Sequence, residues 1–159
     1  MRRLTAACVG MLAACFMIGD ARSAFGQGRC ETAELRPDGD GSSFGRGVSI
    51  LGDWVMVGAV GDDDRGPLAG AAYLFRKVDG AWVGHAKIYA TDTAPYDRFG
   101  YEISQSADAA LIGSFAGAAY IFRNVGGVWT EEAKLTPSDG TDVFGRSVSL
   151  SGDAALVGS

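Results

Sequence analysis

Short apolar runs separated by turn residues follow one another along most of the chain. Within 99–135 the pattern predicts four strands, because runs rich in Val, Ile, Tyr, Phe and Trp alternate with Gly, Asp, Asn and Ser. These strands are expected at about 101–106, 109–114, 118–123 and 128–135. No segment after residue 26 has a convincing helical period. The predicted fold class is therefore all-β.

The same pattern returns as an internal repeat. Segment 44–58 aligns without a gap with 99–113 and with 144–158, and 70–76 aligns with 117–123. Matched blocks in a constant order are the signature of a repeat architecture. We therefore predict units that start near residues 44, 99 and 144. The positions expected to build the repeat are Phe44, Gly45, Phe99, Gly100, Phe144, Gly145, Tyr73, Tyr120, Trp82 and Trp129.

These blocks resemble the FG-GAP repeat family, whose repeats form the blades of integrin-alpha-type β-propellers and of many secreted bacterial proteins. The Phe-Gly pairs carry the resemblance, and Gly58-Ala59-Val60 and Gly113-Ser114-Phe115 stand where the family has Gly-Ala-Pro, without its proline. The resemblance covers about residues 31–159. It implies consecutive four-stranded antiparallel blades of the propeller type.

The number of expected strands is too small for a closed ring. Residues 31–35 match an outermost fourth strand, two complete units follow, and 144–159 supply only a first and a second strand. A closed propeller has roughly four to eight blades of four strands. An incomplete, open arrangement is therefore predicted. It is compatible with a fragment of a longer propeller without independent function, with self-association through open strand edges, and with a short open stack.

The N-terminus has the pattern of an export signal. Arg2 and Arg3 precede the uncharged stretch 4–19, which is shorter than the about 20 apolar residues of a membrane-spanning helix. Small residues favour cleavage at 23/24 or 26/27, so residues 1–26 are interpreted as a signal peptide and 27–159 as the repeat region. The predicted location is secreted, periplasmic or at the cell surface, with no membrane span after removal of the signal. In an alternative, a lipobox-like sequence ending at Cys15 predicts a lipid anchor there.

Composition and charge argue against several functions. The chain has 14 Lys and Arg against 19 Asp and Glu, a net charge of −5, which disfavours nucleic acid as a partner. One His and three Cys provide little for a zinc site or a catalytic histidine, and no nucleophile is paired with a base. His85 is interpreted as an exposed edge position, and Arg46 and Arg146 as structural partners of loop aspartates. We expect a non-enzymatic protein, with the remnant of a propeller enzyme as an alternative.

The acidic residues point to one end of the fold. The units are 55 and 45 residues long, measured from Phe44 to Phe99 and from Phe99 to Phe144, and the difference lies in the loop between strands two and three and in the link between units. Both connections emerge at the same end of an antiparallel meander. This end is the predicted binding surface for a protein or glycan ligand. Its candidate residues are Asp38, Asp40, Asp62, Asp63, Asp64, Asp92, Asp97, Asp139 and Asp142.

Calcium is the one cofactor that this sequence suggests. The resemblance implies a metal loop between strands one and two, but tight turns at Asp53, Asp108 and Asp153 stand there and are too short to surround an ion that needs 6–8 oxygens. Asp62, Asp63 and Asp64 remain weak calcium candidates, and so do Asp38 and Asp40 as a pair.

Overall fold

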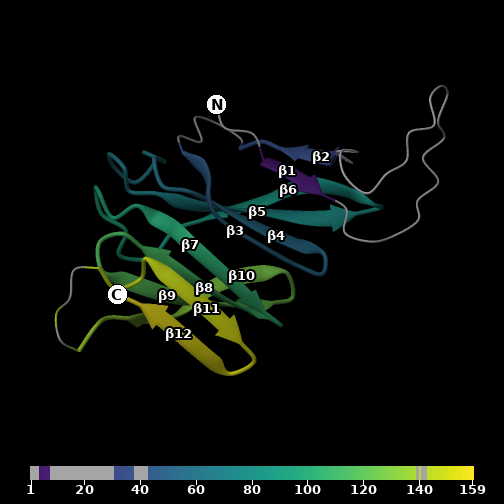
Figure 1. Ribbon diagram of the computed structural model, residues 1–159. Coiled ribbons are helices and arrows are strands. Elements are labelled where there is room, and N and C mark those ends of the chain that lie inside the picture. Colours follow the sequence, from purple (N-terminus) through teal and green to yellow (C-terminus); the bar gives the residue numbers. More distant parts are fainter. Residues whose placement is uncertain (1–3, 8–30, 38–42, 139, 141–142) are drawn as a thin grey trace, which may run out of the picture.

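The protein consists of antiparallel sheets that lie side by side. The structure, a computed structural model, describes residues 4–7, 31–37, 43–138, 140 and 143–159. All regular elements in these residues are strands, and none is a helix, as predicted (Figure 1). The same residues include no helix with the length and apolar character needed to cross a membrane.

Two complete blades follow the order of the chain. Blade one has the strand order β3-β4-β5-β6, and its strands are β3 (Phe44–Leu51), β4 (Trp54–Ala59), β5 (Ala71–Val78) and β6 (Ala81–Ile88). Blade two repeats this order with β7 (Phe99–Ser106), β8 (Ala109–Ser114), β9 (Ala118–Val125) and β10 (Val128–Leu135). The four strands expected in 99–135 are thus confirmed, with only the first and third extended by two residues at one end.

A half-blade and a short N-terminal pair complete the described strands. The half-blade contains β11 (Ser147–Ser151) and β12 (Ala154–Gly158). At the other end of the chain, β1 (Leu4–Ala7) pairs with β2 (Glu31–Leu35), which is the strand expected at 31–35. Strand β1 was not expected from the sequence. Cleavage after residue 23 or 26 stays a prediction, and it would remove β1 and keep β2.

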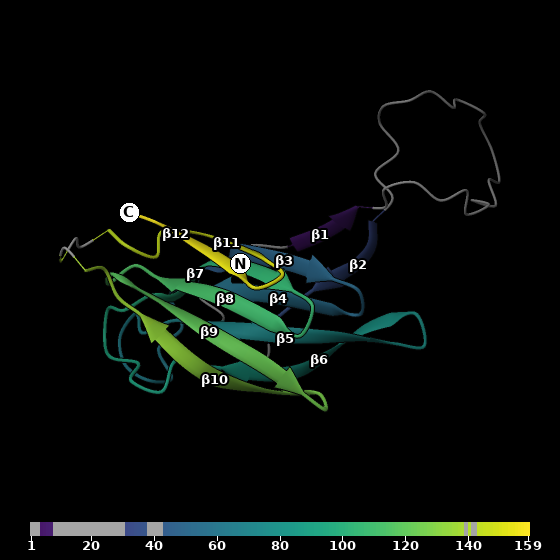
Figure 2. The ribbon, with the colours of Figure 1, turned by 90° about the horizontal axis from the view of Figure 1, so that it is seen from below.

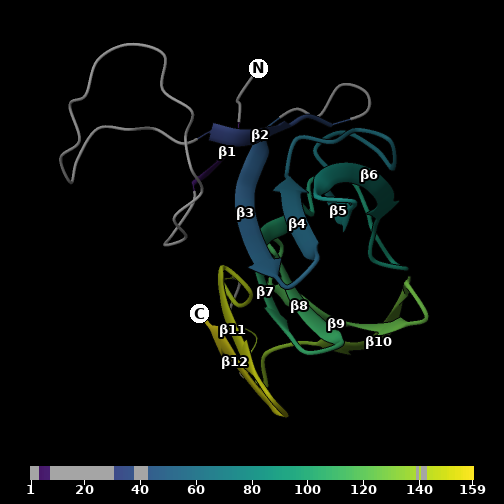
Figure 3. The same ribbon diagram turned by 90° about the vertical axis from the view of Figure 1, so that its right-hand side faces the viewer.

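The blades form an open fan rather than a ring. Figure 3 shows the first strands β3, β7 and β11 next to one another, with the later strands of each blade extending away from them. Successive β3–β7 and β7–β11 contacts join these first strands. Figure 2 shows the two blades and the half-blade as neighbouring layers. The predicted fold class, incomplete blades in an open arrangement, is confirmed.

Apolar side chains fill the space between the blades. Met56 and Leu74 of blade one join Phe99, Ile112 and Phe122 of blade two in one buried cluster. A second cluster covers the opposite face of blade one, where Leu35 of β2 packs among side chains of β3, β4 and β5. Because strands β4 and β8 are buried on both faces, their residues are small or apolar at successive positions rather than alternating with charged ones.

In the two complete blades, the phenylalanine of the Phe-Gly pair packs on the third strand of its own blade. The ring of Phe44 meets Tyr73 edge-on at 5.6 Å between centroids, and Phe99 meets Tyr120 in the same way at 5.6 Å. Both phenylalanines are at most 2% exposed. Phe144 starts the half-blade, which has no third strand among the described residues, and it is only half-buried. The matching environments of Phe44 and Phe99 confirm that these two positions are equivalent.

The glycines of the repeat bring the backbones of neighbouring blades into contact. A Cβ atom on Gly58 would lie 1.8 Å from the carbonyl oxygen of Gly100, and one on Gly113 would lie 1.9 Å from that of Gly145. Gly100 and Gly145 also have φ values of 85° and 89°, in the region that favours glycine. Gly100 and Gly145, the glycines after Phe99 and Phe144, therefore touch the second-strand glycine of the preceding blade. Gly100 and Gly145 thus allow the close approach of strands from neighbouring blades.

Serine side chains connect the first strands of successive blades. The hydroxyl oxygen of Ser49 accepts a hydrogen bond from the backbone N–H of Gln105 at 3.2 Å. One unit later, Ser104 accepts from Leu150 N–H at 2.9 Å. Because Ser49 and Ser104 occupy the same position in the repeat, each interface contains the same backbone-to-serine bond.

We predict that Gly58→Ala lowers the free energy of unfolding by at least about 2 kcal/mol, because its methyl group would overlap the backbone of blade two. The control is Gly80→Ala, where the added methyl meets nothing within 4 Å but φ is 84°. We expect that backbone strain to cost about 1 kcal/mol. Urea unfolding measures both. A Gly58→Ala protein that is more stable than Gly80→Ala would contradict the proposed contact between the blades.

Candidate ligand-binding surface at the loop end

Two long connections meet at one end of the fold, as the repeat lengths predicted. They are the β4–β5 loop (residues 60–70) and the β6–β7 link (residues 89–98), both at the left of Figure 1. The link donates backbone hydrogen bonds to the loop from Tyr96 to Pro67 at 2.8 Å and from Arg98 to Leu68 at 2.9 Å. Gly70 and Phe99 continue this contact as a parallel bridge. The two connections therefore form one surface, called the loop end below.

Asp62 is the buried centre of the loop end in blade one. Its side chain is 3% exposed, forms an ion pair with Lys87, and accepts a hydrogen bond from the Tyr73 hydroxyl at 2.9 Å. Burial acts to lower the pKa of Lys87, but the bonds to Asp62 and Asp64 outweigh it and raise that pKa above its ordinary value. Burial, with a contribution from the Asp62 carboxylate, raises the pKa of Tyr73 to about 12.

Asp64 shares the same lysine from the exposed side. Its carboxylate accepts from Lys87 Nζ at 2.6 Å and from the Tyr89 hydroxyl at 2.8 Å. The bond from Lys87, followed by that from Tyr89, holds the pKa of Asp64 below its usual range. Lys87 thus lies between two carboxylates, where a bound cation would otherwise have to sit.

Blade two contains an equivalent group of a tyrosine, a lysine and a carboxylate, but here the carboxylate comes from a different connection. Lys134 Nζ lies 2.6 Å from Asp92, which belongs to the β6–β7 link rather than to the loop of blade two. The bond from Lys134 lowers the pKa of Asp92, and burial followed by the bond to Asp92 raises the pKa of Tyr120 to about 12. Glu131 adds to this contact by accepting the backbone N–H and hydroxyl of Thr91 at 2.7 and 3.0 Å. The link from blade one is therefore bonded to the outer strand of blade two.

Two further aspartates organise the backbone of the loop end. Asp63 accepts the backbone N–H of Leu68 at 2.6 Å, and Asp97 accepts that of Ala94 at 2.7 Å. The carbonyl oxygen of Asp97 also accepts the hydroxyl of Ser114 in blade two at 2.7 Å. Each described candidate aspartate thus has a partner within the protein. Their role in binding a ligand stays a prediction.

The remaining candidates, Asp38, Asp40, Asp139 and Asp142, lie outside the described residues. Among the residues that are described, no three His, Cys, Asp or Glu side chains come together as a metal ion would require. Instead, the carboxylate oxygens of the calcium candidates Asp62 and Asp64 form ion pairs with Lys87. The repeated lysines were the residues that sequence analysis missed, although Ala86-Lys87 and Ala133-Lys134 recur at matching positions.

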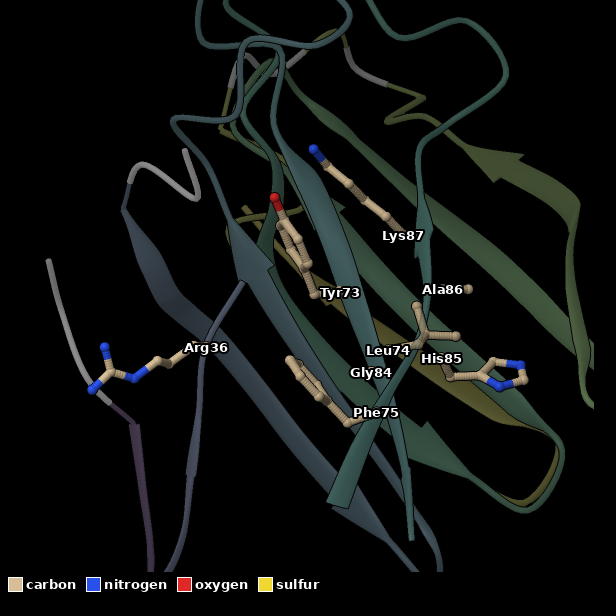
Figure 4. A pocket seen from close by; sticks show the side chains of 8 residues that line it. All are labelled: Arg36, Tyr73, Leu74, Phe75, Gly84, His85, Ala86 and Lys87. Atoms are coloured by element: carbon tan, nitrogen blue, oxygen red, sulfur yellow. The ribbon is translucent and has the colours of Figure 1, made fainter. Parts of the chain in front are cut away.

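A cavity of about 180 Å³ lies on the outer part of blade one, next to the Asp62 network (Figure 4). In Figure 4 the side chains of Tyr73 and Lys87 extend toward the same region, and His85 points away from them. Arg36, which follows β2, borders the cavity from the other side. His85 is exposed, as expected, and its Nε2 atom lies 3.0 Å from the carbonyl oxygen of Gly127.

The recurring tyrosines and tryptophans serve the packing of the blades, as the repeat predicted. Tyr73 and Tyr120 are at most 4% exposed. Trp129 is 8% exposed and meets Trp54 edge-on, with 5.8 Å between ring centroids. Trp82 packs against the buried cluster on the other face of blade one.

The repeated arginines require a correction. We expected Arg46 and Arg146 to pair with loop aspartates, but neither contacts an aspartate in the described part of the chain. The guanidinium group of Arg46 lies 3.9 Å from the ring centre of Tyr101, and that of Arg146 lies 4.0 Å from the ring centre of Phe115. The reason is that blade two offers each arginine an aromatic face: Tyr101, which replaces the arginine in the middle unit, faces Arg46, and Phe115 faces Arg146.

Comparison with known families agrees with this geometry. The model of the FG-GAP repeat family matches three consecutive segments, residues 33–75, 82–122 and 129–159. The chain belongs to the FG-GAP repeat family. Each matched segment begins in or next to an outermost strand and continues into the following blade, so the contact between Gly58 and Gly100 joins two repeats of this protein. No curated protein and no solved structure matches the sequence significantly.

We predict that replacing Lys87 destabilises this FG-GAP protein more than replacing Lys134. Lys87→Met leaves the Asp62 carboxylate, 3% exposed, without its counter-charge and is expected to cost about 3 kcal/mol. Lys134→Met breaks a pair whose side chains are 40% and 48% exposed, with an expected cost below about 1 kcal/mol. Chemical denaturation compares the two. In the double variant Asp62→Asn, Lys87→Met we expect part of the lost free energy of unfolding to be recovered, because no unpaired buried charge remains. Equal losses of stability in the two single lysine variants would refute the difference in burial.

We also predict a loss of stability at alkaline pH. Tyr73 and Tyr120 have pKa values raised to about 12 in the folded protein, above the ordinary value of 10.0. Their contribution is fully present below pH 10 and is lost as pH rises from 10 toward 12, because the unfolded chain releases these protons first. Tyrosinate absorbance during a pH titration should show Tyr73 and Tyr120 among the late-titrating groups, and Tyr73→Phe should remove one of them. Tyr89 joins this late group, because burial and the bond to Asp64 also raise its pKa. Uniform titration of all five tyrosines near pH 10 would contradict this.

Proposed function

We propose that this FG-GAP repeat protein is an exported, non-enzymatic scaffold that binds a protein or a glycan through its loop end. The observation that carries the proposal is the union of the β4–β5 loop and the β6–β7 link into one hydrogen-bonded surface. All length variation between the repeats falls in these two classes of connection. Variable connections on a rigid repeat scaffold are where repeat proteins usually bind their partners.

Tyr96 is the best anchor for a ligand on this surface. Its side chain is 63% exposed, although its backbone is held by the hydrogen bond to Pro67 and has a φ of 71°. An exposed aromatic side chain on an ordered backbone loses little conformational entropy when it is covered by a partner. Arg65 extends from the neighbouring loop and stacks on Tyr89 at 4.9 Å. Tyr96 and Arg65 therefore combine apolar and charged contact at the loop end.

The chemistry of the described residues supports binding rather than catalysis. His85, the one histidine of the chain, contacts a backbone carbonyl and stands edge-on to Trp54 at 4.8 Å. The loop-end carboxylates are bonded to lysines, tyrosines or backbone N–H groups and are thus engaged within the protein.

Export is the second part of the proposal, and it rests on the N-terminal sequence. Basic Arg2 and Arg3 precede an uncharged apolar stretch and small residues suited to cleavage. Mass spectrometry of the exported protein tests it. A mature chain that starts at Ala24 or Gln27 supports signal cleavage, acylated Cys15 supports the lipid anchor, and an intact residue 1 on all copies would refute both.

We predict that Tyr96→Ala, combined with Arg65→Ala, weakens binding to arrayed glycans or to a displayed peptide library at least about tenfold, the loss expected for two interface anchors. The unfolding midpoint should stay unchanged, because both side chains are exposed. Asp53→Ala, in the β3–β4 turn at the opposite end, is the control and should bind as the unmodified protein does. Equal binding by the loop-end variant and this control would refute the loop end as the binding surface.

A further inference from the structure

Three arginines gather beside the first strands at the loop end. Arg46 and Arg146 follow the Phe-Gly pairs of blade one and the half-blade, and Arg98 directly precedes Phe99. Blade two places Tyr101 at the position of the repeated arginine. All three arginines therefore come from corresponding parts of the repeat, at the point where each first strand begins.

Aromatic rings between these arginines join them into one stack. The guanidinium carbon of Arg46 lies 3.9 Å from the ring centre of Tyr101, whose own centre is 5.4 Å from that of Phe115. Arg146 and Arg98 both contact Phe115, at 4.0 and 4.9 Å from the ring centre. The stack, defined as Arg46, Tyr101, Phe115, Arg98 and Arg146, thus spans blade one, blade two and the half-blade.

The positive charges of the stack have no carboxylate partner in the described part of the chain. Contact with a ring uses the flat face of a guanidinium group and leaves its N–H donors, which lie in the plane, free for other acceptors. The Nε atom of Arg146 is buried and lacks an acceptor. The lysines of the loop end, in contrast, are both paired with aspartates.

We propose that the arginine–aromatic stack binds a single oxyanion group, a sulfate, phosphate or carboxylate, carried by a ligand of the loop end. Guanidinium groups match the oxygens of such groups and form stronger hydrogen bonds with them than with neutral acceptors. The surrounding loop end carries exposed Asp63, Asp64 and Asp92, and the whole chain has a net charge of −5. The net negative charge of the chain disfavours extended polyanions such as nucleic acids, so the proposal is restricted to an isolated anionic group. The proposal rests on the proposed function in placing the ligand at the loop end, but it uses other residues than Tyr96 and Arg65, so the two can fail separately.

The test is an NMR titration of the arginine side-chain Nε–H signals in the ¹⁵N-labelled protein. Arg→Lys variants assign the signals, and sodium sulfate, phosphate or acetate replaces sodium chloride at constant ionic strength. We expect saturable shifts at Arg46, Arg98 and Arg146. Arg76 is the matched control, because it also stacks on a ring, that of Trp54 at 5.5 Å, but stands alone near the opposite end. Its signal should not show saturable change.

Variants separate a binding site from a purely structural contact. Arg146→Gln should weaken the binding of the anion roughly tenfold, as expected for the loss of one charged hydrogen-bonding group. Arg76→Gln should leave it unchanged. Arg146→Lys keeps the charge but lacks the planar pair of donors, and it should also bind more weakly. Saturation by sulfate and phosphate alone would assign a tetrahedral group, and saturation by acetate alone would assign a carboxylate. Shifts that do not saturate, or that are equal at Arg76, would overturn the proposal. The stack would then be only a structural contact between the blades.

Discussion

The contact between glycine backbones of neighbouring blades is the constraint on which the rest of the structure depends. Gly58 and Gly100 approach so closely that a single methyl group would overlap the facing carbonyl, and Gly113 and Gly145 repeat the contact one blade later. This distance brings Met56 and Leu74 against Phe99 and closes the apolar layer between the sheets. It also brings Ser49 within hydrogen-bond distance of Gln105. Packing, hydrogen bonding and the spacing of the blades therefore have one common origin.

At the loop end, the two blades keep the same tyrosine and lysine positions but differ in where the carboxylate partner comes from. In both blades a tyrosine of the third strand and a lysine of the fourth strand receive a carboxylate from a connection. In blade one the carboxylate comes from the β4–β5 loop of the same blade and is buried with Lys87. In blade two it comes from the preceding link, so the pair of Lys134 and Asp92 also connects the two blades. The same side chains thus stabilise a long loop in one repeat and an interblade junction in the other.

The half-blade shows how much burial a strand gains from a following blade. Met56, Leu111 and Leu156 occupy the same position in successive repeats, and the first two are fully buried. Leu156 is 73% exposed, because no further sheet among the described residues covers β12. The amino acid at this position is apolar in all three repeats, and only the presence of a next blade decides whether it enters a core.

Much of the fold could be predicted from the sequence because its determinants are local. Strand positions follow from apolar runs and turn residues, and the order of the strands follows from short connections in a repeated unit. The same reasoning placed the two long connections at one end, because alternate connections of a meander must share an end.

The partners of charged side chains could not be predicted in this way. From the sequence, Asp62 is one of three consecutive acidic residues, and Arg46 is one basic residue after a Phe-Gly pair. The structure buries Asp62 against Lys87, 25 residues away in the chain, and places Arg46 on Tyr101 of the next blade. Such pairs depend on which strands become neighbours and on how far each side chain is removed from water. The sequence alone therefore determined the blades, their strands and the order of those strands. The tertiary structure decided which charged side chains are neutralised inside the protein and which remain available to a ligand. The reason is that charge pairing depends on distance and burial in space, and not on spacing along the chain.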